Sequence, residues 1–381
     1  MKPFLSARMQ GIEKTLIRQI HDRADASCLN LGLGELAFPT PRPILDQLRE
    51  ELREWSYGYT PNAGFPELRQ LVAETSGLEV TAEHVCMTIG AEEALLAALM
   101  VLVNPRDEVL IPDPGYPPYA SIVKMAGGIP VPYPLRSENN FSLEPGEVEK
   151  RVTPKTKILL LNSPHNPTGA AYSSAELKSL AELCRRHDLT VVADEVYREI
   201  YYDDRPDSIA HYLHKCIVVN SLSKTYSMTG WRLGWCIGPP ELVRLIITFN
   251  QLAILCPPAV CQRAALLALK GSADEQKRQY LEELRRRRDL TLAGLEKHTD
   301  LKYARPSGAF YVFVDVSPKM PRQGKSLDIC LNILAEEKVV VIPGIAFGQG
   351  GEGFLRLSFA ARPEHIQEGI RRIGRFFSRS R

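Results

Sequence analysis

Short apolar runs alternate with segments of helical spacing between about residues 85 and 240 of this chain. The apolar runs are VCMTI, EVLIP, IPVPYPL, KILLLN, TVVAD, CIVVNSL and RLGWCIG. Runs that are short and apolar throughout are typical of strands buried on both faces, and strands that alternate with helices form parallel sheets. The sequence therefore predicts an α/β domain whose largely parallel sheet is covered by helices.

A second region begins near residue 273. The segment 273–298 is polar and rich in arginine, and it predicts a long helix. After it, YVFVDV, KVVVIP and FLRLSFA have strand character, and LDICLNILAEEK and the C-terminal segment have helical spacing. Because 381 residues are enough for two cores, we expect a large domain at residues 39–275, a smaller α+β domain at 276–381, and a segment at 1–38 that packs with the small domain.

Charge and cysteine content exclude several functions. Lys and Arg (47) almost balance Asp and Glu (45), so the chain lacks the basic excess that binds nucleic acids or anionic membranes. We interpret the basic run at residues 285–288 as a solvated helix face. The eight cysteines form no CxxC pair, as expected for reduced thiols in the cytoplasm. The longest apolar run, residues 94–103, is half the ~20 residues of a membrane span. We expect a cytoplasmic protein that binds no nucleic acid, membrane or metal.

Two glycine-rich stretches match the dinucleotide fingerprint loosely. Residues 32–37 read GLGELA and residues 348–353 read GQGGEG. The fingerprint requires a strand before it and a helix that opens at its end. Prolines follow the first stretch in FPTPRP, and the second stretch runs directly into FLRLSFA. Neither has the required context, and the sequence contains no GxxxxGKS or GxxxxGKT, so nucleotide binding is not predicted.

Polar residues follow five of the predicted strands at the point where each strand ends. They are Gly90, Ala91 and Glu92 after VCMTI, Tyr116 after EVLIP, Asn166 after KILLLN, Asp194 and Tyr197 after TVVA, and Ser221 and Lys224 after CIVVN. The carboxyl ends of parallel strands share one edge, and open α/β sheets bind ligands there. Each residue alone has an ordinary structural explanation as a turn, a helix cap or a surface lysine. Together they indicate a single site.

An amine, a helix N-terminus and a guanidinium in one cleft suit a particular ligand. Lys224 in a water-poor cleft becomes a nucleophile toward carbonyl groups. The helix predicted to start at Gly90 presents backbone N–H groups to a phosphate. Ser221 and Arg232 add a hydroxyl and a positive charge. The set predicts a phosphate ester that carries an aldehyde.

Nine stretches of the chain carry a family resemblance. They are LNLGLGELAFPTP, YGYTPNAGFPELR, TIGAEEAL, DEVLIPDPGYPPY, LNSPHNPTGAAY, VVADEVYREI, VVNSLSKTYSMTGWRLGW, PSGAFYVF and FLRLSFA. In their order and spacing they resemble the class I and II aminotransferases of the fold type I pyridoxal-phosphate family, close to the aspartate aminotransferases. The resemblance implies an enzyme that moves an amino group between an L-amino acid and a 2-oxo acid by a ping-pong mechanism.

The resemblance also implies residue roles. Lys224 forms the imine with the cofactor, pyridoxal 5′-phosphate, and moves the substrate's proton, while Asp194 pairs with the pyridine nitrogen. Asn166 and Tyr197 bond the phenolic oxygen, and Tyr116 stacks on the ring. The catalytic residues would be Lys224, Asp194 and Tyr197. Further cofactor contacts would come from Gly90, Ala91, Glu92, Ser221 and Arg232.

Substrate and partner contacts follow from the same resemblance. Arg356 lies in FLRLSFA on the strand face opposite its leucine neighbours, where a guanidinium suits the substrate α-carboxylate. Gly34 and Asn166 would add substrate contacts. Tyr59 resembles the family tyrosine that reaches a phosphate across the subunit interface, which implies a homodimer with shared active sites.

Three questions stay open at this point. Lys14 is a candidate cation for a distal substrate carboxylate, whereas Glu92 stands where some aspartate-specific relatives have lysine. A carbon–sulfur β-lyase of the same fold would share the imine. His165 in SPHNPTG is similar to some such lyases, although Tyr197 and SMTGWRLGW are closer to aminotransferases. A non-enzymatic regulator of this family would carry an additional N-terminal DNA-binding domain, for which we expect no room before about residue 30.

Overall fold

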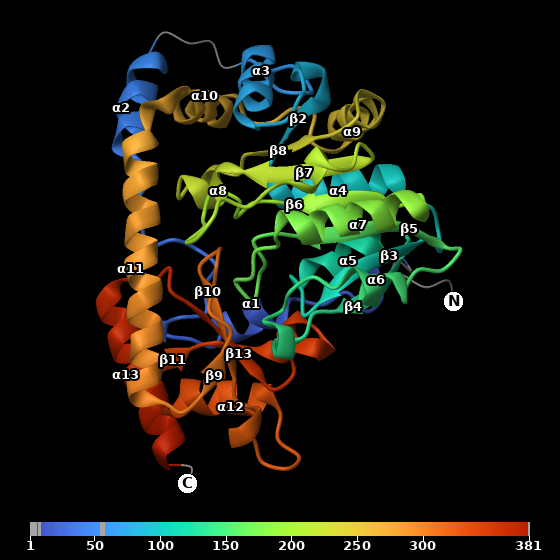
Figure 1. Cartoon of the computed structure of the whole chain (residues 1–381). Helices are drawn as coiled ribbons and strands as arrows, with labels where there is room; N and C mark the ends of the chain where they lie inside the picture. Colours follow the sequence, from blue (N-terminus) through green and yellow to red (C-terminus); the bar gives the residue numbers. More distant parts are fainter. Residues whose placement is uncertain (1–5, 7–8, 54–57, 380–381) are drawn as a thin grey trace.

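A seven-stranded sheet forms the centre of the computed structural model, which describes residues 6, 9–53 and 58–379 (Figure 1). In sheet order, its strands are β2 (Val85–Thr88), β8 (Gly234–Ile237), β7 (Cys216–Ser221), β6 (Thr190–Asp194), β5 (Thr156–Asn162), β3 (Glu108–Asp113) and β4 (Ile129–Pro134). Each of the seven apolar runs of the sequence is therefore a strand, as predicted.

Only β8 runs against its neighbours among these seven strands. It pairs antiparallel with β2 and β7, whereas β7–β6, β6–β5, β5–β3 and β3–β4 are parallel pairs. The prediction of a largely parallel sheet is confirmed. Strands β3, β5, β6 and β7 end at one edge, where Asn162 and Asp194 are register partners.

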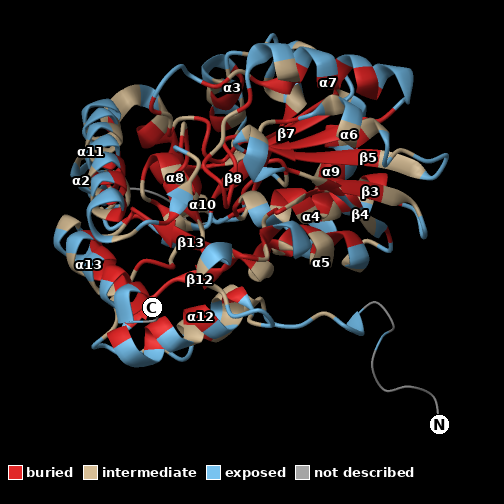
Figure 2. Ribbon diagram, turned by 60° about the horizontal axis from the view of Figure 1, so that its bottom comes forward, coloured by how far each residue is buried: buried red, intermediate tan, exposed pale blue. Residues whose placement is uncertain are grey.

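Helices cover both faces of this sheet. One face carries α4 (Ala91–Leu102), α5 (Pro118–Met125) and α9 (Pro240–Ala253), and the other carries α3 (Pro66–Thr75) and α7 (Ser174–Arg186). In β6, Val192 packs with the first group of helices, and Val191 and Ala193 pack with the second. Because successive strand residues point to opposite faces, a strand covered on both sides is apolar throughout. Figure 2 shows the buried strands between helices with exposed outer surfaces.

The long helix α11 (Asp274–His298) leads away from this sheet to a smaller one (Figure 1). The smaller sheet is antiparallel, in the order β12 (Ile342–Pro343), β13 (Phe354–Ser358), β10 (Tyr311–Asp315) and β9 (Lys302–Tyr303). The remaining helices are α1 (Leu16–His21), α2 (Arg42–Glu51), α6 (Pro145–Glu149), α8 (Leu222–Thr225), α10 (Ala259–Leu267), α12 (Ser326–Asn332) and α13 (Pro363–Arg379), which packs along α11.

The domain boundaries expected from the sequence stay predictions. No helix of the described residues has both the length and the apolar character of a membrane span.

The apolar run KVVVIP forms two short strands and not one. β11 (Val339–Val340) pairs parallel with β1 (Leu29–Asn30), whereas β12 pairs antiparallel with β13. The chain passes from one sheet to the other at Val341, which is fully buried. An apolar pattern shows burial but does not show with which neighbour a strand pairs, so this division was not predicted.

The prediction that residues 285–288 form a solvated helix face is wrong for two of the four. Arg287 and Arg288 are only 6% and 5% exposed. The Arg287 guanidinium donates to the Ala360 carbonyl oxygen at 3.0 Å and lies 4.4 Å from the ring centre of Phe38. A carbonyl acceptor and an aromatic face replace water around this cation. The contacts fix α11 against the segment that follows β13.

Candidate active site

A cavity of ≈ 560 Å³ lies at the carboxyl edge of the large sheet. The predicted site residues that line it are Gly34, Ala91, Glu92, Tyr116, Asn166, Asp194, Tyr197, Ser221, Lys224, Arg232 and Arg356. Gly90 lies directly beside the cavity, next to Ala91. Tyr59 does not line the cavity, and its side chain is 88% exposed. Residues separated by more than 300 positions in the sequence therefore meet around one space.

Lys224 projects from α8, a single helical turn that directly follows β7. The Ser221 side chain caps this turn by accepting from the Ser223 backbone N–H at 3.3 Å. The Lys224 Nζ donates to the Gly34 carbonyl oxygen at 2.7 Å. Burial lowers the pKa of Lys224 to about 8, and the neighbouring Arg356 adds to this effect. The amine is therefore partly neutral, and so nucleophilic, near neutral pH.

Asp194 ends β6 and forms the acidic floor of the cavity. Its Oδ2 accepts a hydrogen bond from the Tyr119 hydroxyl at 2.8 Å, and its backbone carbonyl accepts from the Asn162 side chain at 2.9 Å. Burial raises the pKa of Asp194 to about 6, while the bond from Tyr119 opposes this shift. Tyr119 was not among the site residues predicted from the sequence. Its only signal was its place three residues after Tyr116 at the start of α5.

The N-terminus of α4 and two glycines form a concave site that suits an anion. Gly90 has φ +90°, and a Cβ there would lie 2.6 Å from the Arg232 guanidinium. A Cβ on Gly234 would lie 2.9 Å from the Ala91 nitrogen. Both glycines let backbone and guanidinium approach closely around the first N–H groups of α4. Helix N-termini of this kind bind phosphate through these N–H groups.

Arg356 is a buried cation on β13, with 2% of its surface exposed. It donates to the Asn166 Oδ1 at 2.8 Å and to the Gly32 carbonyl oxygen at 2.6 Å. Its guanidinium lies 4.3 Å from the ring centre of Tyr311 and 4.8 Å from that of Phe347. Its buried Nε has no hydrogen-bond partner among the described residues. The remaining N–H groups are thus available to a carboxylate in the cavity that Arg356 lines.

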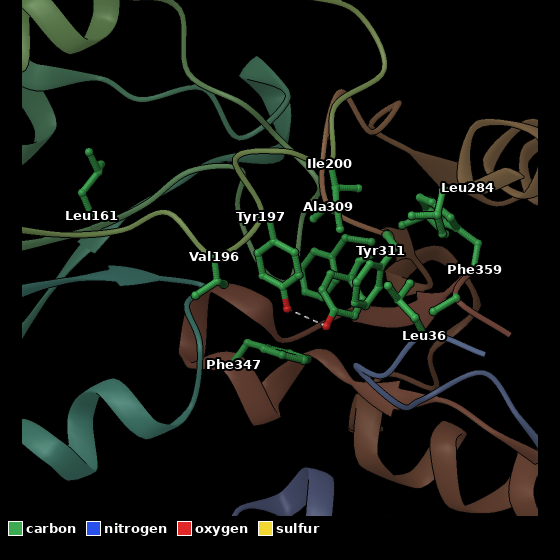
Figure 3. Close-up of a cluster of buried hydrophobic side chains, with 14 of the residues drawn as sticks. Leu36, Leu161, Val196, Tyr197, Ile200, Leu284, Ala309, Tyr311, Phe347 and Phe359 are labelled. Atoms are coloured by element: carbon green, nitrogen blue, oxygen red, sulfur yellow. Dashed lines mark hydrogen bonds between the residues drawn. The ribbon is translucent and has the colours of Figure 1, made fainter. Parts of the chain in front are cut away.

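Two tyrosine hydroxyls meet at the side of the cavity. The Tyr197 and Tyr311 oxygens lie 2.9 Å apart and point toward each other (Figure 3). A Cβ on Gly34 would lie 2.5 Å from the Tyr311 hydroxyl, so only glycine leaves room for it. Tyr311 lines the cavity, yet the sequence pattern predicted it only as part of a strand. No local pattern distinguishes it from the other aromatic residues of that strand.

Helix α1 covers part of the cavity. Its cap residue Thr15 and its residues Ile17 and Arg18 line the space. Lys14, the predicted candidate for a distal carboxylate, does not line it and pairs with Asp22 at 3.0 Å. The structure therefore brings Arg18 into the site in place of Lys14.

His165, which pointed to a β-lyase, lies outside the cavity. It is fully buried, and its Nδ1 lies 2.8 Å from the Thr168 hydroxyl. Burial lowers the pKa of this imidazole to about 3, so it stays neutral. Its place is that of a buried group within the turn that presents Asn166, and it has no access to a substrate.

The fold and the groups at this edge match one family. The model of the family "Aminotransferase class I and II" matches residues 26–373. The chain belongs to this family and is an aminotransferase, a transferase of nitrogenous groups with the fold type I architecture.

Individual relatives align with nearly the whole chain. It is 36% identical to a "Probable aspartate aminotransferase" of Methanocaldococcus jannaschii, across 98% of this chain and 100% of that protein. It is 37% identical to "Aromatic-amino-acid aminotransferase 2" of Thermococcus litoralis, across 97% of each chain. The structure of the Thermus thermophilus aspartate aminotransferase with maleate superposes with a TM-score of 0.93, at 34% identity, across 99% of this chain and 100% of that one.

Proposed function

We propose that this aminotransferase holds pyridoxal 5′-phosphate through Lys224 and uses it to transfer the amino group of an amino acid to a 2-oxo acid. The observation that carries the proposal is the convergence on one cavity of a half-buried amine, a buried acid and an anion-binding helix N-terminus. The donor set fits the group, since the amine suits its aldehyde, the N-terminus of α4 its phosphate, and Asp194 its ring nitrogen.

Each neighbour of the cofactor would have a distinct task. When bound, pyridoxal 5′-phosphate supplies an electron sink for the charge that develops at the substrate α-carbon. Asp194 would hold a proton at the ring nitrogen, and Tyr116 would pack on the ring. Asn166 and Tyr197 would donate to the phenolic oxygen. The backbone N–H groups of Ala91 and Glu92, next to Gly90 at the start of α4, would hold the phosphate together with Ser221 and Arg232.

Two basic side chains, Arg356 and Lys224, would act on the substrate. Arg356 binds the α-carboxylate and is itself fixed by Asn166 and the Gly32 carbonyl. The neutral Lys224 amine would remove the proton from the substrate α-carbon and then give it to the bound cofactor. A pKa of about 8 suits both directions, since the amine can accept and give a proton near neutral pH. The same residues then act on the second substrate in reverse.

We propose further that two copies of the chain form a dimer with shared active sites. Tyr59 is 88% exposed, and nearby exposed residues Leu252 (84%) and Leu255 (39%) add apolar surface. The Asn62 side chain donates to the Leu255 carbonyl oxygen at 2.6 Å, so the loop of Tyr59 and the end of α9 lie side by side. A surface of this kind favours burial against a second copy, where Tyr59 would reach the partner's phosphate. The cytoplasmic location stays a prediction.

The first experiment supplies the cofactor-loaded protein with one amino acid at a time and no 2-oxo acid. We expect each accepted amino acid to release one equivalent of its 2-oxo acid per site, after which the reaction stops until a 2-oxo acid is added. Released 2-oxo acid is quantified by chromatography. Continuous formation of pyruvate and ammonia from a β-substituted amino acid would instead identify a β-lyase.

Tyr119→Phe is expected to weaken cofactor binding at neutral pH. The hydroxyl donates to a buried carboxylate, and such bonds contribute about 1.5–3 kcal/mol, which is roughly 10- to 100-fold in affinity. Protonated Asp194 cannot form an ion pair with the ring nitrogen, so affinity falls as the pH drops through its pKa. Without the Tyr119 bond this pKa rises, and the loss begins at a higher pH. The measurement is the cofactor Kd between about pH 5 and pH 8.

Tyr133→Phe is the matched control for this experiment. The buried Tyr133 hydroxyl donates to the Leu160 carbonyl oxygen at 3.0 Å, away from the cavity. The control loses one buried hydrogen bond and should keep the pH profile of the wild type. Equal profiles for Tyr119→Phe and the wild type would show that Tyr119 does not act on Asp194.

A further inference from the structure

Asn162 lines the active-site cavity, yet it has no task in the proposed mechanism. It is the last residue of β5, its register partner on β6 is Asp194, and 1% of its surface is exposed. An amide buried this deeply costs free energy unless both its donor and its acceptor are bonded within the protein. The partners of Asn162 therefore show what it is placed to hold.

The Asn162 amide joins the main chains of two site residues. Its Nδ2 donates to the Asp194 carbonyl oxygen at 2.9 Å, and its Oδ1 accepts from the Asn166 backbone N–H at 2.9 Å. One partner is an acceptor and the other a donor, so a single orientation of the amide satisfies both. Because one planar group makes both bonds, it sets the spacing between these two points of the main chain.

The main chain around Asn166 offers no substitute for this amide. Two backbone hydrogen bonds close the turn 165–170, and neither involves Asn166. Among the described residues, Asn162 provides the only hydrogen bond of the Asn166 N–H. The Asp194 carbonyl oxygen, in contrast, also accepts from the Ser163 N–H at 3.2 Å. Loss of the amide would therefore free Asn166 more than Asp194.

The hydrogen bonds continue from Asn166 to the residue that would bind the substrate. The Asn166 Oδ1 accepts from the Arg356 Nη1 at 2.8 Å, and the two residues are 4% and 2% exposed. In the proposed mechanism, Asp194 meets the ring nitrogen, Asn166 the phenolic oxygen and Arg356 the α-carboxylate. One buried, hydrogen-bonded path thus links the groups that hold the cofactor with the group that holds the substrate.

From this path, we infer that Asn162 is a positioning residue, whose amide holds Asp194 and Asn166 in place around the cofactor ring. Through Asn166 it also sets the position of Arg356. The inference rests on the proposed function, because the tasks of these three residues come from it. Asn162 acts through its neighbours and takes no part in the proton transfer. Fully bonded, buried polar networks of this kind hold their members in one arrangement.

The pH dependence of the absorbance of the cofactor-loaded protein tests the inference without substrate. This absorbance changes as a proton leaves the linkage between Lys224 and the cofactor, next to the phenolic oxygen. A donor to that oxygen weakens the negative charge that holds the proton, and so lowers the pH midpoint of the change. In Asn162→Ala, Asn166 is no longer fixed at the oxygen, so we expect the midpoint to rise by roughly 0.5–1 pH unit.

The second readout is the Kd of 3-phenylpropionate, which carries one carboxylate, and of its uncharged amide. We expect Asn162→Ala to reduce the preference of the loaded protein for the acid several-fold, because Arg356 loses a fixed acceptor. Asn162→Ser keeps one hydroxyl for either partner, so both of its changes should be smaller and of the same sign. It replaces Asn162→Ala if thermal unfolding shows that the alanine variant does not fold.

Asn250→Ala is the matched control. Asn250 is also a fully buried amide, and its Nδ2 donates to the Met87 carbonyl oxygen at 3.2 Å, but it does not line the cavity. This variant should keep the midpoint and the acid preference of the wild type, whatever stability it loses. The same result in folded Asn162 variants would overturn the inference alone, since Asn162 would then only support the end of β5. A wild type that forms no linkage with the cofactor would instead reject the proposed function.

Discussion

Lys224→Ala is expected to abolish covalent retention of the cofactor and to lower kcat by at least roughly 10²- to 10⁴-fold, the contribution of a general base alone. The Lys224 Nζ is the half-buried amine that lines the cavity, at 2.7 Å from the Gly34 carbonyl oxygen. Borohydride reduction followed by intact-mass measurement detects the linkage. The wild type should gain the mass of the reduced cofactor after denaturation, and the variant should not.

Two comparisons make this result specific. Lys155→Ala removes an exposed lysine directly before β5 and should behave like the wild type. In Lys224→Ala, added methylamine should restore part of the turnover, because a free amine can move the proton that Lys224 no longer moves. The variant should stay folded, since it loses an amine whose charge burial disfavours. A mass gain and normal turnover in Lys224→Ala would reject the assignment.

The topology of the sheet explains why most of the site could be predicted. Chain order alone places Asp194 and Lys224 at one edge, because parallel strands end on the same side. No distance information is needed for that step. The central strands β5, β6 and β7 could be predicted because both of their faces are covered, which leaves an almost unbroken apolar run in each.

Residues that reach the site from other elements could not be placed in this way. Tyr119 acts on Asp194 from within α5, and Tyr311 reaches Tyr197 from the small sheet. Their directions depend on how α5 and β10 pack, which no local pattern records. Arg18 and Lys14 are four residues apart on one exposed segment, and only the packing of α1 decides which of them lines the cavity.

The second glycine-rich stretch illustrates the same limit. Context excluded GQGGEG as a nucleotide site, but the sequence did not reveal its role. The Gly350 N–H donates to the Asp113 Oδ1 at 2.8 Å, and a Cβ on Gly348 would overlap with the Asp113 carboxylate. Gly348 and Gly350 allow the loop before β13 to contact Asp113 at the end of β3. A requirement for close backbone contact leaves the same signature as a phosphate-binding loop.

Arg356→Ala is expected to weaken binding of every substrate carboxylate while the cofactor stays bound. Removing one partner of a buried charged pair costs about 2–5 kcal/mol, which is roughly 30- to several thousand-fold in Kd. The ligand pair that isolates the effect is 3-phenylpropionate and its uncharged amide. The wild type should prefer the acid strongly, and Arg356→Ala should lose this preference.

The conservative variant separates charge from geometry. Arg356 keeps its place through the Asn166 Oδ1 and the Gly32 carbonyl, and its guanidinium lies against the Tyr311 ring. Arg356→Lys keeps a positive charge, but an ammonium lacks the planar, forked donors that bind these two acceptors and a carboxylate together. We therefore expect its loss of carboxylate affinity to lie between those of the wild type and Arg356→Ala. Thermal unfolding shows whether either variant has lost its fold. If folded Arg356→Ala still prefers the acid over the amide as the wild type does, the α-carboxylate binds elsewhere in the cavity.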